Sequence, residues 1–83
     1  MRQIRYFATI AREGTISRAA RKLGISQPAL SKQLGELEAS LGQTLLERGA
    51  RTVKLTDKGE VFRKRAEEIL SLVDCTVREV SCG

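Results

Sequence analysis

The fold of this chain is decided by residues 23–34, which run Leu-Gly-Ile-Ser-Gln-Pro-Ala-Leu-Ser-Lys-Gln-Leu. Gly24 readily adopts the left-handed conformation that ends a helix, and Ser26 is a favourable N-cap for the next one. Pro28 fits a helix only in its first turn, where its missing N–H has no helical partner. Ile25 lies between these signals and is expected to fill the core. The stretch therefore predicts two helices joined by a tight turn.

Helical periodicity continues on both sides of this turn. Apolar residues recur at helical spacing in a predicted helix over residues 2–12, which Gly14 and Thr15 break. We expect Ser17 to cap the second helix and Gly42 to follow the third. The residues expected to be buried are Ile4, Phe7, Ala8 and Ala11 in the first helix, Ala19, Ala20 and Leu23 in the second, and Leu30, Leu34, Leu37 and Leu41 in the third.

The pattern changes after residue 44. Two short runs, residues 45–47 and 53–55, flank a glycine-containing loop and predict a two-stranded hairpin, or wing. Thr56 is placed to cap a final helix. In that helix, steps of four and three alternate between apolar or small residues, which is typical of a coiled-coil seam and predicts a dimerisation helix. The seam consists of Phe62, Ala66, Ile69, Val73, Thr76 and Val80.

Together these elements predict a mainly α fold. Three helices and a two-stranded wing form a winged helix-turn-helix over residues 1–58, and a long linker helix covers residues 59–83. In a winged helix-turn-helix, the second helix of the turn fits the DNA major groove and the hairpin flanks it. The 83 residues are too few for a catalytic cleft between two lobes.

The charge of the chain supports nucleic acid as its partner. Lys and Arg number 15 against 10 Asp and Glu, and the formal net charge is +5. A solvated basic surface would give the same excess, so the placement of the charge decides. The fold is expected to bring five basic residues of the second helix, the third helix and the wing to one surface: Arg18, Lys32, Arg48, Arg51 and Lys54. This clustering favours double-stranded DNA.

The exposed edge of the third helix carries side chains that suit base recognition. Gln27 offers a paired donor and acceptor for adenine, and Lys32 can reach guanine or a phosphate. The carbon surfaces of Pro28 and Ala29 suit a thymine methyl group, and Ser31 is a small polar neighbour on the same edge. Taken alone, Gln27 could be an ordinary first-turn residue and Pro28 a helix starter, but the surrounding pattern favours recognition.

The chain also matches a known family pattern without a gap from Ile4 to Gly59. The matching positions are Ile4, Phe7, Ala19-Ala20, Leu23, Ser26 to Leu34, Leu37-Glu38, Leu41-Gly42, Leu45, Arg48, Leu55-Thr56 and Gly59. On these positions the chain resembles the DNA-binding domain of the LysR-type transcriptional regulators of bacteria. Agreement at so many positions makes the resemblance specific.

The resemblance implies roles for individual residues. It places Gln27, Pro28, Ala29, Ser31 and Lys32 in the major groove and Arg51 of the wing in the adjacent minor groove. It implies phosphate contacts for Ser17, Arg18, Lys54 and Thr56, and we assign Arg48 to the same group. It also implies a homodimer formed through the linker helices, often assembled into tetramers in full-length proteins, on an interrupted inverted repeat.

The chain departs from the family pattern in places. Lys32 stands where arginine is common, Leu46 where phenylalanine is frequent, and Gly35 where a longer side chain is usual. Lysine lacks the planar fork of arginine, so Lys32 could serve a phosphate instead of a base. Family members also carry a C-terminal domain that binds a small-molecule effector. We expect any effector to act through that domain, which this sequence does not contain.

Other classes of function fit the sequence less well. An enzyme is disfavoured because histidine is absent and no nucleophile has a general base at plausible spacing. Neither a metal nor another cofactor is expected, because Cys75 and Cys82 are too few for a zinc site. About 10 Å of helix also separates these two cysteines, which is beyond disulfide reach.

Membrane binding is disfavoured as well. Acidic residues alternate with the basic ones around Arg63, Lys64 and Arg65, and no apolar run approaches the ~18 residues of a membrane span. No secretory signal is present at the start, so a cytoplasmic location is expected. The alternative function that we retain is a winged-helix protein-interaction module, whose basic surface would meet an acidic partner.

Overall fold

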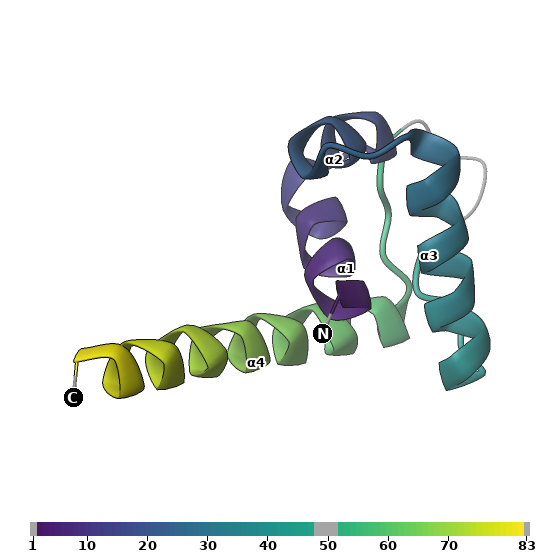
Figure 1. Cartoon of the computed structure of the whole chain (residues 1–83). Coiled ribbons are helices and arrows are strands. Elements are labelled where there is room, and N and C mark those ends of the chain that lie inside the picture. The colour runs from purple at the N-terminus through teal and green to yellow at the C-terminus, as the bar shows by residue number, and fades with distance from the viewer. Residues whose placement is uncertain (1, 48–51, 83) are drawn as a thin grey trace.

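The computed structural model describes residues 2–47 and 52–82, most of which lie in four helices. The helices are α1 (Arg2–Glu13), α2 (Ile16–Leu23), α3 (Gln27–Leu41) and α4 (Asp57–Cys82). α1 to α3 and the segment that leads to α4 form a head, and α4 passes beneath this head and continues to one side (Figure 1). The mainly helical fold expected from the sequence is confirmed.

The corner between α1 and α2 differs from the sequence prediction. Gly14 follows α1 in a left-handed conformation, with φ +85°, and its N–H donates to Ile10 O at 3.1 Å. Thr15 is extended, and its hydroxyl oxygen accepts the N–H of Arg18 at 3.0 Å. Thr15 therefore caps α2, and the prediction of Ser17 as the N-cap is wrong. The reason is that Gly14 turns the chain at once, so Ser17 already lies in the first turn of α2.

The core of the head lies between α1, α2, α3 and the segment that follows α3. Its largest fully buried side chains are Phe7, Ile10, Leu30 and Leu45. The stripe predicted on α1 is partly wrong, because Ile10 is completely buried whereas Ile4 and Ala11 are only half-buried. α1 contacts α2, α3 and α4, so its buried face is wider than one stripe.

The buried edge of α3 ends one turn earlier than predicted. Leu30, Leu34 and Leu37 are buried as expected, but Leu41 is 44% exposed. Gly42 ends the helix in a left-handed conformation, with φ +66°, and the chain turns back into the core of the head. Buried leucines of the following segment fill the core in place of Leu41.

We call residues 45–47 and 53–55, the two sides of the segment between α3 and α4, the hairpin base. Leu46 and Leu55 face each other in one antiparallel bridge. The N–H of Val53 donates to Gly14 O at 2.7 Å, so the returning side of the hairpin is attached to the α1–α2 corner. Residues 2–47 and 52–82 contain no strand, and the rest of the predicted hairpin lies at residues 48–51, outside the described residues. The two-stranded wing therefore stays a prediction.

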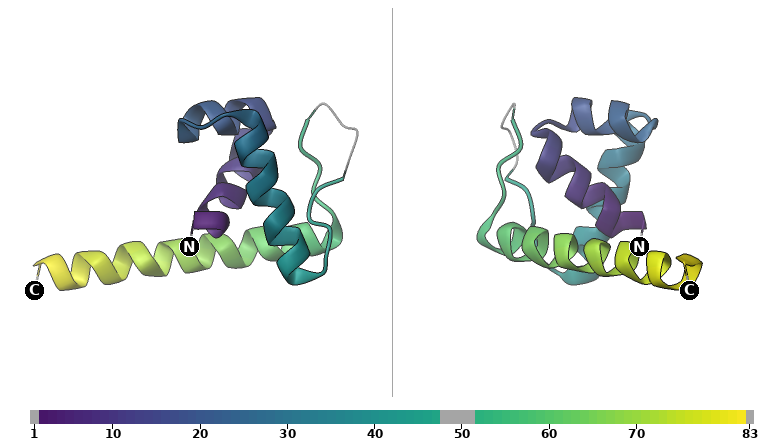
Figure 2. Two further views of the ribbon diagram at one scale, coloured as in Figure 1. Left: turned by 45° about the vertical axis from the view of Figure 1, so that its right-hand side comes forward. Right: turned by 90° about the vertical axis from the view of Figure 1, so that its left-hand side faces the viewer.

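α4 packs against the head at its start and leaves it afterwards. The ring of Phe62 lies edge-on to that of Phe7, and Ala66 is buried. Beyond Ala66 the helix extends away from the head as an arm, which two further views show clear of α2 and α3 (Figure 2). Within the described ranges, none of the helices combines the length and hydropathy needed to span a bilayer.

Candidate nucleic-acid interface

The connection between α2 and α3 has the geometry of a helix-turn-helix. Gly24 is left-handed, with φ +72°, and the N–H of Ile25 closes the end of α2 by donating to Ala20 O at 3.0 Å. The hydroxyl oxygen of Ser26 accepts the N–H of Ala29 at 3.2 Å and so caps α3. The stop and start signals predicted from the sequence are confirmed at this turn.

α3 presents its first two turns to solvent. The five residues predicted to contact bases are all exposed: Gln27, Pro28, Ala29, Ser31 and Lys32. Pro28 lies in the first turn, as predicted. Within the described part of the chain, no side chain bonds to the side-chain polar groups of Gln27, Ser31 or Lys32. These groups are available to a ligand, beside the positive N-terminal end of the helix dipole.

Glu38 fixes the hairpin base to α3. Its side chain is almost fully buried, and Oε2 accepts the N–H groups of Leu45 at 2.6 Å and Leu46 at 3.2 Å. A carboxylate that accepts two backbone donors forms charge-assisted hydrogen bonds, which are stronger than neutral ones. The sequence prediction gave Glu38 no role. Its signal was present, because Glu38 lies four residues after Leu34 on the buried edge of the helix.

Thr56 and Gly59 fix the start of α4 to the same segment. The Thr56 N–H donates to Leu45 O at 3.0 Å, and its hydroxyl donates to Thr44 O at 2.6 Å. The hydroxyl oxygen also accepts the Gly59 N–H at 3.0 Å, so Thr56 caps α4 as predicted. A β-carbon at Gly59 would overlap Leu45 O, so only glycine allows this approach of the two backbones.

Three of the predicted phosphate contacts come from segments that the fold brings together. Ser17 and Arg18 are exposed in the first turn of α2, and Lys54 is exposed beside the hairpin bridge. The hydrogen bond between the hairpin and Gly14 attaches the segment of Lys54 to the corner where α2 begins. The remaining basic residues of the predicted wing, Arg48 and Arg51, lie outside the described residues.

Charge is divided unequally between the head and α4. Ten of the 15 Lys and Arg residues, but only four of the 10 Asp and Glu residues, precede α4. The ion pairs between described residues all lie on α4, where Arg63 pairs with Glu60 and Glu67, and Arg65 pairs with Glu68. The hydrogen bond to Glu60, reinforced by the charges of Glu60 and Glu67, raises the pKa of Arg63 above its ordinary value. The positive charge of the head is left largely unbalanced.

Comparison with known proteins assigns these features to a family. Residues 1–60 match the family model described as "Bacterial regulatory helix-turn-helix protein, lysR family". The chain belongs to this family. It is a LysR-family helix-turn-helix DNA-binding domain, as the sequence resemblance predicted.

Relatives of this LysR-family chain are transcriptional regulators. The chain is 49% identical over 81 residues to the HTH-type transcriptional regulator BsdA of Bacillus subtilis, and 46% identical over 79 residues to BudR of Klebsiella aerogenes. These alignments cover 96% and 95% of the chain, but 28% and 55% of the relatives. The chain thus spans between about a quarter and about a half of these curated relatives.

Solved structures of LysR-family domains have the same fold. The chain is 45% identical to the DNA-binding domain of BenM in complex with benA site 1 DNA, with a TM-score of 0.93, covering 96% of this chain and 93% of that one. It is 38% identical to the CbnR DNA-binding domain in complex with DNA, with a TM-score of 0.90, covering 98% of this chain and 93% of that one.

The residues of the seam predicted on α4 of this LysR-family chain fall into two groups, one packed within the chain and one exposed. Phe62 and Ala66 pack within the chain, and Val73 is half-buried. Ile69 and Val80 are exposed, and Thr76, which is also exposed, donates its hydroxyl to Leu72 O at 2.8 Å. Three further exposed apolar residues of α4 were missing from the predicted seam: Val61, Leu72 and Val77.

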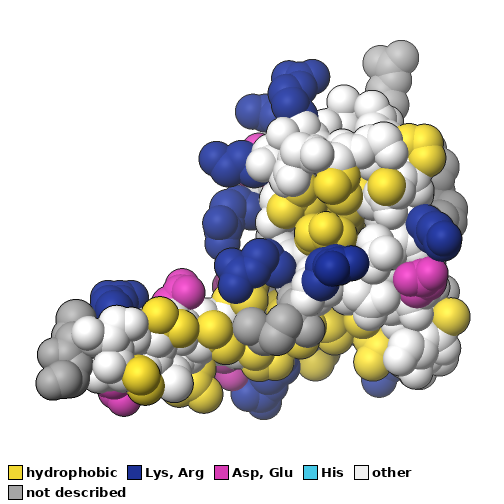
Figure 3. Space-filling view, in the orientation of Figure 1, with side chains coloured by type: hydrophobic (Ala, Val, Ile, Leu, Met, Phe, Trp, Pro, Cys, Tyr) yellow, Lys and Arg dark blue, Asp and Glu magenta, His cyan; other side chains and the backbone are white. Residues whose placement is uncertain are grey.

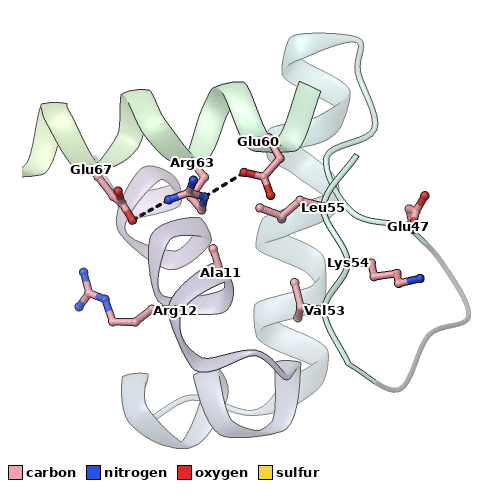
Figure 4. Close-up of a pocket in the computed structure, with 9 residues that line it drawn as sticks. All are labelled: Ala11, Arg12, Glu47, Val53, Lys54, Leu55, Glu60, Arg63 and Glu67. Atoms are coloured by element: carbon pink, nitrogen blue, oxygen red, sulfur yellow. Dashed lines mark hydrogen bonds and ion pairs between the residues drawn. The ribbon is translucent and has the colours of Figure 1, made fainter. Parts of the chain in front are cut away.

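A hollow of about 710 Å³ lies between α1, the hairpin base and α4 (Figure 4). Ala11, Val53 and Leu55 line it, and Arg63 lies there between the carboxylates of Glu60 and Glu67. The charges in the hollow therefore largely compensate one another. No cluster of three or more His, Cys, Asp or Glu side chains suited to a metal occurs in the described part of the chain.

Proposed function

We propose that this chain binds double-stranded DNA with sequence specificity, as the DNA-binding domain of a transcriptional regulator. The observation that carries the proposal is the exposed start of α3, whose polar side chains are free of partners within the described chain and are held out by the helix-turn-helix. The likeness to the BenM domain, which was solved with DNA, supports it. The chain acts by binding, without catalysis, and works on DNA in the cytoplasm.

α3 lies in the major groove, with its N-terminal residues nearest the base edges. Gln27 pairs its amide with adenine, and Ser31 contributes a hydroxyl one turn further along. Pro28 and Ala29 offer carbon surface to a thymine methyl group. Lys32 is exposed on the same helix and reaches guanine or a phosphate.

Phosphate contacts flank α3 and fix its position on the duplex. Ser17 and Arg18 contribute from the first turn of α2, and Lys54 contributes from the hairpin base. Arg48 joins this group, and Arg51 enters the adjacent minor groove. Thr56 is assigned to capping and not to phosphate, because its hydroxyl hydrogen is donated to Thr44 O.

Two copies of the chain associate through their α4 helices. Phe62 and Ala66 are engaged by their own chain, so the contact between copies uses the exposed apolar residues further along: Ile69, Leu72, Val77 and Val80, with Val73 and Thr76 beside them. The boundary that we place between residues 58 and 59 then separates a DNA-binding domain from a dimerisation helix. The first turns of that helix nevertheless pack against the head. In the full-length protein, the family resemblance implies that such dimers are often assembled into tetramers.

Selection of bound sequences from a random DNA pool, followed by a salt titration, tests the function. We expect one selected sequence that is preferred over random DNA at every salt concentration, while the affinity for both falls steeply as salt rises. If random DNA competed equally throughout, the chain would not be a specific DNA reader, and the alternative of a protein-interaction module would take its place.

A further inference from the structure

Five basic residues on α1 and α2 take no part in the interface proposed above. We call them the α1–α2 ridge, and they are Arg2, Arg5, Arg12, Arg21 and Lys22. All five are exposed, and none is among the ion pairs between described residues, which lie on α4. Arg12 also lines the hollow that contains Glu60 and Glu67. Lys and Arg side chains form a column along one side of the head, above the arm of α4 (Figure 3).

The ridge is continuous with the phosphate contacts at the start of α2. A small hollow is lined by Arg18, Arg21, Lys22 and Glu13. Arg18, a predicted phosphate contact, therefore lies beside Arg21 and Lys22 of the ridge. On α1, Arg5 and Arg12 are separated by about 10 Å along the helix and project from the same edge. Glu13 is the one acidic residue in the sequence of α1 and α2.

The composition of the ridge favours a phosphate backbone over a protein partner. The cores of protein–protein interfaces are apolar and depleted of charged residues. The exposed large hydrophobic side chains of the described chain all lie elsewhere, at the end of α3 and along α4. The ridge offers only charge and hydrogen-bond donors, which is the chemistry that a polyanionic duplex requires.

We infer that the α1–α2 ridge binds the phosphates of DNA that flanks the site contacted by α3. The inference rests on the proposed function and extends the footprint of each head beyond the recognised bases. DNA that leaves the start of α2 curves toward α1, and the added phosphate contacts offset the cost of bending.

The test compares duplexes of two lengths that carry the same selected site. A short duplex ends at the site, and long ones extend by one helical turn, about 10 bp, on one side or the other. For the unaltered chain we expect a steeper dependence of log Kd on log salt with one of the long duplexes, by about 0.9 for each added phosphate contact. For Arg5→Gln/Arg12→Gln we expect this extra slope to fall by about 2, the share of two phosphate contacts, while binding to the short duplex is unchanged.

The matched control is Lys64→Gln/Arg78→Gln on α4, which removes the same charge from exposed positions away from the ridge. It should keep the extra slope. Equal slopes for the short and long duplexes with the unaltered chain, or an extra slope that is not reduced by loss of Arg5 and Arg12, would overturn the inference. Failure of the proposed function is distinct, because it would remove sequence preference on the short duplex itself.

Discussion

The ring of Phe62 on α4 lies edge-on to the ring of Phe7 on α1, with centroids 5.1 Å apart and planes at 90°. Phe7 is 1% exposed, so this contact joins the long helix directly to the core of the head. Edge-to-face pairs of this kind contribute stability beyond the apolar area that they bury. The start of α4 is therefore part of the DNA-binding head in a structural sense.

Phe62→Ala should lower the free energy of unfolding by roughly 2–3 kcal/mol, because it removes this ring contact and leaves a cavity against Phe7. Thermal unfolding followed by circular dichroism measures the loss. Ser71→Ala, at an exposed position of the same helix, should change stability by less than about 0.5 kcal/mol. Equal effects of the two substitutions would show that Phe62 does not anchor α4.

Glu38→Gln should destabilise the chain by about 1–2 kcal/mol, because the amide keeps one acceptor oxygen but loses the charge that strengthens the bonds to Leu45 and Leu46. Denaturant unfolding measures this change. Glu36→Gln, at an exposed position two residues earlier, is the control and should be close to neutral. A neutral result at Glu38 would mean that its carboxylate does not hold the hairpin base.

Gly35→Ala and Gly59→Ala should act in opposite directions. A β-carbon at Gly35 meets nothing within 4 Å, so alanine should stabilise α3 by about 1 kcal/mol and raise Tm by about 4–8 °C. A β-carbon at Gly59 would overlap Leu45 O, so alanine there should cost about 1–3 kcal/mol. Melting curves of the two variants measure the difference, and a shift of the same sign in both would contradict the assigned geometry.

Gln27→Ala should weaken binding to the selected DNA site by roughly 1–3 kcal/mol and binding to random DNA only slightly, as expected for a residue that contacts a base edge. Fluorescence anisotropy with both duplexes measures the two affinities. Gln43→Ala, just after the opposite end of α3, should affect neither. Equal losses on both duplexes would make Gln27 a backbone contact.

Ile69→Asp should weaken association between two copies, because it places a charge in the exposed apolar face of α4. Val73→Asp should act in the same direction. Sedimentation velocity over a range of concentrations measures the oligomeric state. Ser71→Asp adds the same charge at an exposed polar position and should leave association intact. An unchanged dimer with Ile69→Asp would exclude the proposed contact.

Local signals allowed the helix-turn-helix to be predicted from the sequence. The signals at Gly24, Ser26 and Gly42 depend only on the backbone geometry of each residue and on hydrogen bonds within about one turn. The rest of the fold therefore does not change the structure that they predict. The cap of α2 was harder, because Ser17 and Thr15 are both suitable residues. The choice depended on the left-handed conformation of Gly14, which the sequence does not specify.

Features that depend on distant contacts were predicted less well. The partners of Glu38 are backbone N–H groups seven and eight residues away, and no side-chain pattern marks them. The periodicity of α4 was recognised, but the same spacing serves packing within a chain and packing between chains. Phe62 and Ala66 pack within the chain, whereas we propose that Ile69 packs between chains. Only the folded structure distinguishes the two cases.

The contact between Gly59 and Leu45 has a consequence for the spacing of binding sites. Because two backbones touch there with no side chain between them, the start of α4 cannot shift against the segment of Leu45 without breaking that packing. In the proposed dimer, both the separation and the relative rotation of the two α3 helices are then fixed by α4. Half-sites separated by whole helical turns, each about 10.5 bp, would keep both helices facing their grooves, whereas inserting half a turn would rotate one half-site to the opposite face of the duplex.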